Sequence, residues 1–404
     1  MTKINSDFIK TIPKTDLHCH LDGSLRLSTL IELAKEQNIM LPAQTEEELS
    51  KLVFKDTYQD LVEYLRGFQY TVAVMQTPEA IERIAYELGL DAYAEGVCYL
   101  EVRFAPQLHV NANLDLLAVL TSVHNGLNKA KKEINRQEEI KKGDKPGFEF
   151  GIIGCALRMF KKSYSPYYRS LFNLHPDMPD EERFGLASLD LVRALIKARN
   201  DCGLAIVGVD LAGAEKGYPA EAHRHAYELA HKHFFKKTVH AGEAYGPASI
   251  FQAITDCHTD RIGHGTHLFN YNMVDLPDVN ERKKYVQALA QYIADRRITI
   301  EICLTSNRQT IPALKEPSAH PFKQMLEARI STTFCTDNRL ISRTTISQEV
   351  ELALKNFEIS LSTLKDIIIY GFKRSFHPGN YSEKREYVRQ VIDYYEAVEQ
   401  KFGL

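Results

Sequence analysis

The sequence lacks several features that would place it in a simpler class of protein. No stretch of its 404 residues approaches 18 consecutive apolar residues, and the N-terminus has no apolar core of the kind found in signal peptides. The formal net charge is -3, and no basic run could form a charged face. We therefore expect a cytoplasmic protein with neither a nucleic-acid nor a membrane partner.

The cysteines of the chain are not arranged to form disulfides or a zinc-thiolate site. The seven cysteines are odd in number, scattered, and form no C-x-x-C pair. Five of them lie in or beside apolar runs, as reduced and buried cysteines do. Neither a disulfide framework nor a zinc-thiolate site is expected, so a metal ion would have to rely on histidine and carboxylate ligands.

The stretch 14–25, KTDLHCHLDGSL, is the first with an evident chemical use. Alternate side chains of a β-strand point to the same face, so His18 and His20 could hold one metal ion between them. The predicted strand leads into Leu-Asp-Gly, a turn signal, and α/β barrels keep their catalytic residues at such strand ends. We therefore predict that this stretch forms part of a metal site.

Two other H-x-H pairs have a different interpretation. They are His223/His225 and His231/His233. Both fall in residues 219–233, whose apolar spacing is typical of a helix, where positions two apart diverge. We predict that both pairs lie on the solvated surface of that helix.

Strand and helix patterns alternate along the chain. After the strand that begins near Thr15, apolar runs predict seven more strands, at 97–105, 148–156, 204–211, 235–240, 261–264, 298–304 and 330–336. Helical patterns lie between them, among others at 78–95, 114–135, 187–200, 248–256, 281–295 and 322–327. Eight such units predict an α/β fold with a parallel sheet closed into a (β/α)8 TIM barrel.

The remaining segments are assigned to the same domain. Residues 27–68 are helical in character, and 58–70 carries aromatic and leucine residues that fit either a helix on the core or a lid over the first motif. Residues 345–404 are helical and should flank the barrel. Because no interdomain linker is visible, residues 1–404 are predicted to form one domain, with a core at about 14–345.

The carboxyl ends of four predicted strands carry side chains that bind metal ions or move protons. They end, in chain order, at His18 and His20, at His240 and Glu243, at His264 and His267, and at Asp337 and Asn338. Three imidazoles and one carboxylate suit a catalytic Zn²⁺, which lowers the pKa of a bound water toward about 7. The fourth strand ends at Asp210 without a lysine at its tip, so one metal ion is the simpler interpretation. The predicted ligands are His18, His20, His240 and Asp337.

Glu243 and His264 are the candidates for proton transfer. Glu243 lies three residues beyond His240, across a glycine that lets the backbone turn tightly. A carboxylate near a metal ion, but not bound to it, can relay a proton between water and substrate. His264 could hold an attacking hydroxide by a hydrogen bond or take its proton, whereas His267 is expected to be peripheral. By itself His240 is more typical of a hydrogen-bonded core histidine, and Glu243 has the alternative of being a surface residue in a loop, but ligands at four strand ends favour the metal site.

Five motifs, in this order, resemble those of the adenosine deaminase family. They are TDLHCHLDGSLR, DLAGAE, VHAGE, RIGHG and TDN, between Thr15 and about Thr345. The resemblance implies the (β/α)8 barrel of the metal-dependent amidohydrolases, with extra helices. It also implies hydrolytic deamination of adenosine or 2′-deoxyadenosine to inosine or deoxyinosine with release of ammonia, in purine salvage.

The same resemblance implies a role for each site residue. One Zn²⁺ per chain would be bound by His18, His20, His240 and Asp337. Glu243 would give a proton to N1 of the purine, and His264 would orient the hydroxide that attacks C6. Asp22 would bind a ribose hydroxyl, and the backbone N–H of Gly213 would donate to N3. His20 is expected to contact the substrate as well.

Two positions depart from the commonest family pattern. Asn338 stands where many relatives have a second aspartate, but its amide can still donate a hydrogen bond to N7 of the purine. Leu304 stands where a proline is frequent. Activity is expected to survive, and purine discrimination is the property that Asn338 would alter.

Other functions stay open at this stage. The substrate could be another N6-amino purine, such as adenine, methylthioadenosine or aminodeoxyfutalosine. From a different class, the chain could be a non-catalytic purine- or metal-binding relative, although such a protein would not need every metal and proton-transfer position filled. The signature of zinc deaminases that edit nucleic acid, H-x-E followed by P-C-x-x-C, is absent, which favours a free nucleoside.

Overall fold

An eight-stranded parallel sheet forms the centre of the protein. The computed structural model describes residues 4–59 and 61–404. The strands follow one another around the sheet in chain order, and each adjacent pair is parallel. Their bounds are β1 Lys14–His20, β2 Val97–Phe104, β3 Glu149–Leu157, β4 Ile206–Ala212, β5 Lys236–Ala241, β6 Arg261–His264, β7 Thr299–Ile302 and β8 Thr332–Phe334.

The sheet closes into a barrel where β1 meets the residues that follow β8. The backbone N–H of His20 donates to the carbonyl of Asp337 at 2.7 Å, and the N–H of Asp337 donates to the carbonyl of His18 at 2.7 Å. The eight strands lie within two residues of their predicted bounds at each end. The predicted (β/α)8 barrel is therefore confirmed.

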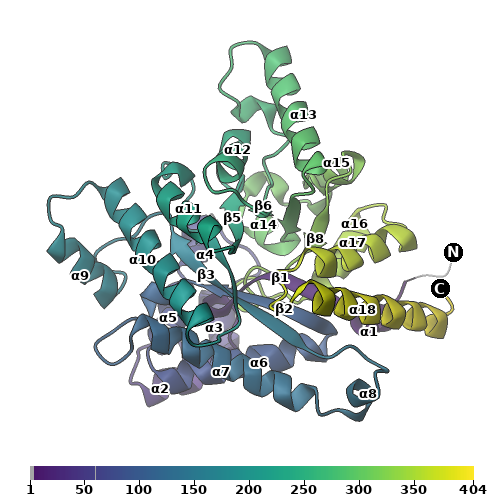
Figure 1. Cartoon of the computed structure of the whole chain (residues 1–404), viewed down its shortest axis with the longest axis horizontal. Helices are drawn as coiled ribbons and strands as arrows, with labels where there is room; N and C mark the ends of the chain where they lie inside the picture. Colours follow the sequence, from purple (N-terminus) through teal and green to yellow (C-terminus); the bar gives the residue numbers. More distant parts are fainter. Residues whose placement is uncertain (1–3, 60) are drawn as a thin grey trace.

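Helices surround the barrel and connect its strands (Figure 1). In the first half of the chain they are α1 Ser6–Thr11, α2 Leu27–Glu36, α3 Glu46–Leu52, α4 Leu61–Leu65, α5 Phe68–Val74, α6 Pro78–Ala94, α7 Leu116–Ile134, α8 Glu138–Lys141, α9 Pro166–Leu174 and α10 Asp180–Asn200. In the second half they are α11 Arg224–Lys232, α12 Pro247–Thr255, α13 Val279–Asp295, α14 Leu304–Thr310, α15 Phe322–Glu327, α16 Ile346–Asn356, α17 Leu361–Arg374 and α18 Tyr381–Phe402. Short 3-10 turns join some of them, including η1 Leu21–Gly23 and η3 Ala220–His223.

Local sequence signals account for several of these elements. Thr77 caps α6 by accepting the N–H of Ala80 at 3.2 Å, and Pro78 occupies the first helical turn, where it is favoured. Asn380 and Glu383 form a capping box at the start of α18. Every residue of β2 and of β4 is buried, which explains why both have the near-continuous apolar character of strands covered on two faces.

Residues 27–68 are helical in character, as predicted, but the helices are separate. Helices α2, α3 and α4 are separated by non-helical stretches at 37–45 and 53–59. Pro42 and the capping residue Thr45, whose hydroxyl accepts the N–H of Glu48 at 3.3 Å, explain the first of these breaks.

His223 is buried, which contradicts the prediction that it lies on the solvated surface. Its Nδ1 lies 2.7 Å from Oγ of Ser188 in α10, and burial lowers the pKa of His223 to about 3. The reason is that residues 219–233 are not one helix, because the 3-10 turn η3 precedes α11 and packs against α10. His225 and His231 are exposed, as predicted.

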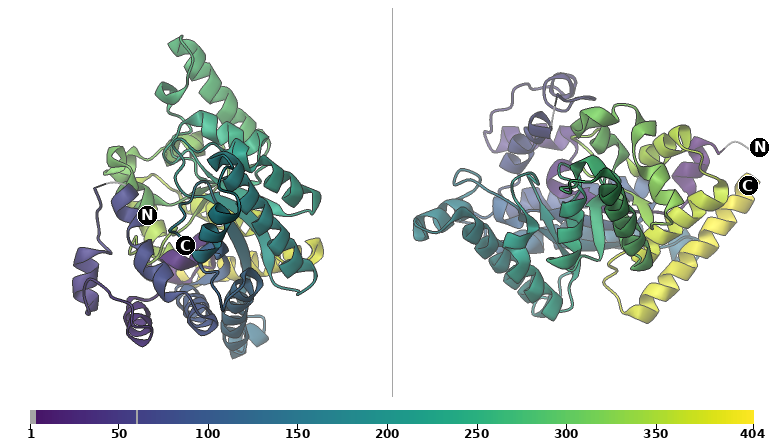
Figure 2. Two further views of the ribbon diagram at one scale, coloured as in Figure 1. Left: turned by 90° about the vertical axis from the view of Figure 1, so that its left-hand side faces the viewer. Right: turned by 90° about the horizontal axis from the view of Figure 1, so that it is seen from above.

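The C-terminal helices cover one side of the barrel. Helix α17 packs against β1 and β8, and Gly371 approaches Thr15 so closely that an added Cβ would lie 2.2 Å from its hydroxyl oxygen. Phe8 of α1 packs edge-on against Tyr395 and Phe402 of α18, with ring centroids 6.2 and 5.6 Å apart. The first and last helices therefore lie side by side, while α13 projects away from the barrel (Figures 1 and 2). Among the described residues, none of the helices has both the length and the apolar character needed to cross a membrane.

Candidate active site

The four predicted metal ligands meet at the carboxyl ends of the strands. His18 and His20 lie at the end of β1, His240 lies near the end of β5, and Asp337 follows β8. Their exposed fractions are 9% or less. Residues from three places in the sequence thus form one buried cluster at the mouth of the barrel.

The donor atoms of this cluster are spaced as in a single metal site. Nε2 of His240 lies 3.0 Å from Nε2 of His18 and 3.2 Å from Nε2 of His20. Oδ1 of Asp337 lies 3.5 Å from Nε2 of each of those two histidines. Donors around a tetrahedral zinc ion lie about 3.3 Å apart, because Zn–N bonds are about 2.0 to 2.1 Å long. One ion could therefore contact all four side chains.

Two buried carboxylates fix which nitrogen of these histidines carries the proton. Nδ1 of His18 donates to Glu301 at 2.8 Å, and Nδ1 of His240 donates to Asp210 at 3.0 Å. With the protons there, the Nε2 atoms of His18 and His240 present lone pairs to each other at 3.0 Å. Such lone pairs repel unless a cation lies between them, and histidines backed by carboxylates are typical of metal sites. The donor set therefore fits a metal ion.

A buried ion-pair network holds these carboxylates ionised. Arg103 of β2 donates to Asp210 at 3.2 Å and to Glu301 at 3.0 Å. Burial alone would raise the pKa of both carboxyls, but His240 and Arg103 hold the pKa of Asp210 well below its usual range, and Arg103 and Arg261 do the same for Glu301. Arg103 was not predicted from the sequence, in which its only signal is a charged residue inside an apolar strand.

A chain of hydrogen bonds orients His264, at the end of β6. Nδ1 of His320 accepts the N–H of Phe322 at 3.1 Å, so Nε2 of His320 carries the proton and donates to Oδ1 of Asn307 at 3.2 Å. The amide nitrogen of Asn307 then donates to Nδ1 of His264 at 3.0 Å. This network assigns the proton of His264 to Nε2, which lies 3.7 Å from Oε2 of Glu243.

His264 is also close enough to be a metal ligand. One potential donor atom from each of His18, His240, His264 and Asp337 lies within 4.8 Å of the others. We favour His20 over His264, because a nitrogen that carries a proton has no lone pair for a metal ion. Burial lowers the pKa of His264 well below its usual value, so His264 is a neutral hydrogen-bond donor.

His264 and Asp337 both have a left-handed backbone. Their φ angles are 66° and 60°, a conformation uncommon for residues other than glycine. Such conformations are concentrated at functional sites, where the surrounding structure holds them. Asp337 is held through its backbone bonds to β1 and through Oδ2, which accepts the hydroxyl of Ser306 at 2.5 Å.

Glu243 lies in the loop after β5 and has the properties of an acid. Burial raises the pKa of Glu243 to about 8, and the charges of Asp337 and Glu215 add to the rise. A carboxyl group that is still protonated at neutral pH is suited to give a proton to a substrate. Glu215, of the DLAGAE motif, had no role predicted from the sequence. Its carboxylate holds this loop by accepting several backbone N–H groups.

The residues predicted to bind substrate lie at the same end of the barrel as the cluster, after β1, β4 and β8. Asp22 is buried, burial raises its pKa to about 7, and its Oδ1 has no hydrogen-bond partner among the described residues. Nδ2 of Asn338 donates to Oη of Tyr64 at 2.9 Å, while Oδ1 of Asn338 is also buried without a described partner. Gly213 follows β4 with a φ of 96°, which glycine adopts without strain. Buried oxygens without partners are typical of places where a polar ligand binds.

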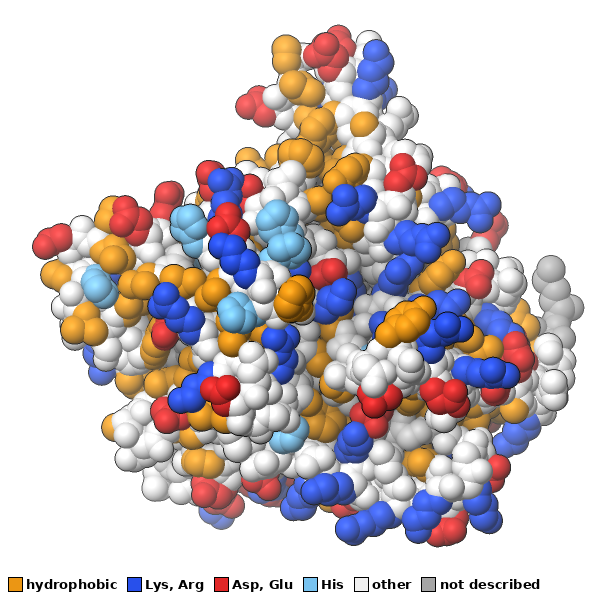
Figure 3. Space-filling model, in the orientation of Figure 1, with side chains coloured by type: hydrophobic (Ala, Val, Ile, Leu, Met, Phe, Trp, Pro, Cys, Tyr) orange, Lys and Arg blue, Asp and Glu red, His pale blue; other side chains and the backbone are white. Residues whose placement is uncertain are grey.

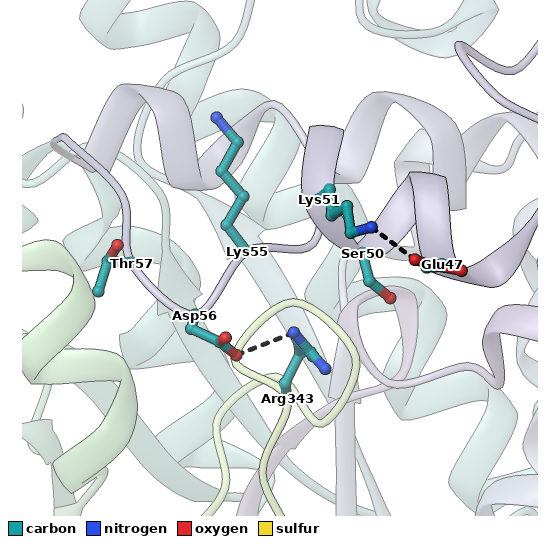
Figure 4. A pocket seen from close by; sticks show the side chains of 7 residues that line it. All are labelled: Glu47, Ser50, Lys51, Lys55, Asp56, Thr57 and Arg343. Atoms are coloured by element: carbon teal, nitrogen blue, oxygen red, sulfur yellow. Dashed lines mark hydrogen bonds and ion pairs between the residues drawn. The ribbon is translucent and has the colours of Figure 1, made fainter.

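The segment from α3 to α4 borders this site. Tyr64 of α4 is buried, and its hydroxyl also lies 2.7 Å from that of Ser342. Between this segment and the loop after β8 is a surface cavity of about 550 Å³, lined by Glu47, Ser50, Lys51, Lys55, Asp56, Thr57 and Arg343 (Figure 4). Arg343 donates to Asp56 across it at 2.9 Å. The segment is thus packed on the core next to Asn338, and the ion pair between Arg343 and Asp56 spans the cavity.

Sequence comparisons give one consistent family. The profile of the family described as adenosine deaminase matches residues 13–165 and 177–394. An adenosine deaminase of Mycobacterium avium is 34% identical over 386 residues, which cover 95% of each chain. A probable adenosine deaminase of Dictyostelium discoideum is 34% identical over 398 residues; these cover 98% of this chain, which spans only 45% of that longer protein.

Solved structures of other deaminases and amidohydrolases share the fold. An adenine deaminase of Arthrobacter aurescens superposes with a TM-score of 0.73 at 21% identity, covering 95% of this chain and 99% of that one. An amidohydrolase of Burkholderia ambifaria with bound Zn superposes with a TM-score of 0.76 at 18% identity, covering 99% and 96%. At 21% and 18% identity, this similarity is one of fold, that is, of the barrel and its added helices.

Proposed function

This chain belongs to the adenosine deaminase family, and we propose that it catalyses the hydrolytic deamination of adenosine and 2′-deoxyadenosine to inosine and deoxyinosine. Ammonia is the second product. The observation that carries the proposal is the buried set of three imidazoles and one carboxylate beside Glu243 and His264. We take residues 1–404 as one catalytic domain with a core at about 14–345, and the cytoplasmic location stays a prediction.

One Zn²⁺ per chain is proposed as the cofactor. Its ligands would be His18, His20, His240 and Asp337. The support is the spacing of their donor atoms and the two lone pairs that face each other at 3.0 Å. When bound, such an ion supplies Lewis acidity, which makes a water molecule acidic at neutral pH. Asp210 and Glu301 would keep His240 and His18 in the tautomer that leaves Nε2 free.

Glu243 and His264 would act on the purine ring and on the attacking water. Glu243 donates its proton to N1, which makes C6 more electrophilic. The Nε2–H of His264 holds the attacking oxygen in place by a hydrogen bond. Water adds its oxygen to C6; one of its protons goes to the amino group, which leaves as ammonia, and the other returns to Glu243 as a carbonyl forms at C6. The raised pKa of Glu243 supports the first step, and the tautomer of His264 supports the second.

The nucleoside would be recognised by polar groups around this centre. Asp22 accepts a hydrogen bond from a ribose hydroxyl, and the backbone N–H of Gly213 donates to N3. The second amide hydrogen of Asn338 donates to N7, because the first is already given to Tyr64. His20 borders the same space. The unpartnered Oδ1 of Asp22 supports a ligand at this place.

A panel of substrates tests the proposal on the purified, zinc-loaded full chain. Adenosine and 2′-deoxyadenosine should be converted to inosine and deoxyinosine with one ammonia released for each, as measured by chromatography and an ammonia assay. Adenine, methylthioadenosine, aminodeoxyfutalosine and N6-methyl-AMP complete the panel. A clear preference for any of these four would replace the proposed substrate. Absence of all turnover in folded, metal-containing protein would favour a binding protein instead.

A further inference from the structure

A second cavity opens at the amino ends of the strands, on the opposite side of the barrel from the proposed active site. Its volume is about 710 Å³. Its walls come from the residues that begin β5 and β6, from those just before β7, and from the segment that joins α17 to α18. We call it the basic cavity, and its charged or partly charged lining residues are His231, Lys236, Lys237, His258, Asp260, Arg261, Arg296, Arg297, Lys373, Arg374 and Lys384.

The lining of the basic cavity is strongly positive, whereas the whole protein is slightly acidic. It holds eight lysines and arginines but one aspartate, in a chain whose formal net charge is -3. Figure 3 shows Lys and Arg side chains gathered between α13 and the C-terminal helices α17 and α18, which border the cavity. Cations that line a recess reinforce one another's field and attract anions into it.

Three of these eight cations have carboxylate partners. Lys236 and Lys237 share Asp260, with Nζ–oxygen distances of 3.5 and 3.4 Å. Arg261 is buried and pairs with Glu101 and with Glu301, the latter at 2.7 Å. These contacts account for the cations on the strand side of the cavity without any ligand.

Lys384 bonds to backbone carbonyls and to no carboxylate of the described residues. It donates to the carbonyls of Lys373 and Ser375 at 2.9 and 2.7 Å. Burial lowers the pKa of Lys384 to about 8, although Glu101 opposes the fall, and Arg261, Lys236 and Arg374 lower it further. Lys384 is therefore held among like charges at a cost in electrostatic free energy.

The other four cations form no ion pair with any described residue. They are Arg296, Arg297, Lys373 and Arg374. Nε of Arg374 is buried and has no hydrogen-bond partner in the described chain. Its neighbour Arg297 is close enough to lower the pKa of Arg374 further, after burial, which is the larger cause. An unpaired buried donor is unfavourable unless a polar partner binds there, and the nearby charge of Arg297 favours an anion in that place.

We propose that the basic cavity binds an oligophosphate, that is, a small molecule with two or more linked phosphate groups. A ligand with several negative charges matches four unpaired cations better than a single phosphate does. The planar guanidinium groups of Arg296, Arg297 and Arg374 suit paired hydrogen bonds to phosphate oxygens. Because the cations line a recess bordered by α13 and α18, a compact anion reaches them more readily than the backbone of a nucleic acid duplex. The proposal does not depend on the reaction at the other end of the barrel.

Isothermal titration of the full, metal-loaded chain tests the proposal with inorganic tripolyphosphate, guanosine triphosphate and inorganic phosphate as probes. Tripolyphosphate should bind more tightly than phosphate, and its affinity should fall as salt is added. Equal affinity for guanosine triphosphate would assign recognition to the phosphates, and tighter binding would add a contact to the nucleoside. The double variant Arg297→Gln/Arg374→Gln should weaken tripolyphosphate binding at least about tenfold.

A matched control removes the same charge elsewhere. The double variant Arg169→Gln/Arg193→Gln changes two exposed arginines on α9 and α10, outside the cavity, and should bind tripolyphosphate like the parent. Removal of the metal ion by tripolyphosphate would affect both variants equally, so it cannot imitate the expected difference. Both variants should keep the parent's melting temperature and adenosine turnover. Equal binding by the two variants, binding no tighter than that of phosphate, or tighter binding of a DNA duplex would overturn the proposal.

Discussion

Glu215 accepts the backbone N–H of Glu243 at 3.0 Å. The same buried carboxylate accepts the N–H groups of Gly242, Ala244 and Tyr245 and the hydroxyl of Ser249. One side chain from the connection after β4 thus holds the loop after β5. The position of the proposed acid depends on these hydrogen bonds, because residues 242–246, between β5 and α12, belong to neither a strand nor a helix.

Glu215→Gln should lower kcat while leaving the metal content unchanged. The amide has one acceptor oxygen instead of two, so some of the loop N–H groups lose their partner and Glu243 is less well placed. A loss of about 1 to 3 kcal/mol corresponds to a roughly 5- to 150-fold fall in kcat. Glu221→Gln, an exposed glutamate of η3, is the matched control and should behave like the parent. Loss of the metal ion from Glu215→Gln would show that Glu215 supports the metal site and not only the loop that carries Glu243.

Glu243→Gln should keep both the fold and the metal ion but remove the proton for N1. The expected fall in kcat is about 10² to 10⁴, the usual contribution of one general acid. Steady-state kinetics and elemental analysis of the same preparation measure the two properties together. If the variant kept more than about a tenth of the parent's kcat, a change of under ~1.4 kcal/mol, Glu243 would not be the acid.

The rate should depend on pH through Glu243. Burial raises its pKa to about 8, so the carboxyl is protonated below that value and can donate. As the pH rises through about 8 the protonated fraction falls, and kcat/KM should fall about tenfold for each further unit. Below pH 8 this group imposes no loss. The alkaline limb should disappear in Glu243→Gln, and a flat profile up to pH 10 in the parent would contradict the assignment.

Asp210→Asn should weaken metal binding. Asp210 holds Nδ1 of His240 and is itself paired with Arg103, so the amide would supply neither the charge nor a reliable acceptor. Loss of such a supporting carboxylate typically costs about 10- to 100-fold in metal affinity. Competition with a zinc chelator measures the change, with Asp201→Asn at the exposed end of α10 as control. Equal affinity in the two variants would remove Asp210 from the metal site.

Asp22→Ala should reduce the use of nucleosides without affecting the metal ion. A hydrogen bond to a charged group is worth about 1.5 to 3 kcal/mol, so kcat/KM for adenosine should fall about 10- to 150-fold. Adenine has no sugar hydroxyl, and any activity on it should be unchanged. Intact adenosine turnover in the variant, or parent protein that deaminates adenine as well as adenosine, would show that the ribose contact is wrong.

The sequence by itself determined the order of strands and helices and the identity of the side chains at the strand ends. Both depend on short-range patterns: apolar runs, capping residues and turn signals specify local structure, and a parallel barrel places all strand carboxyl ends on one side. The sequence therefore predicts that four side chains lie close together: His18, His20, His240 and Asp337. Their roles, and that of the bound ion, stay predictions.

Only the tertiary structure decided which groups act on one another across the barrel. The contact of Arg103 with Asp210 and Glu301 joins β2, β4 and β7, and the proton on Nε2 of His264 depends on His320, far along the chain. The basic cavity likewise assembles cations from the starts of separate strands and from the C-terminal helices. None of these contacts has a local signature, because each depends on the register with which eight strands close and on which side chains that closure removes from water.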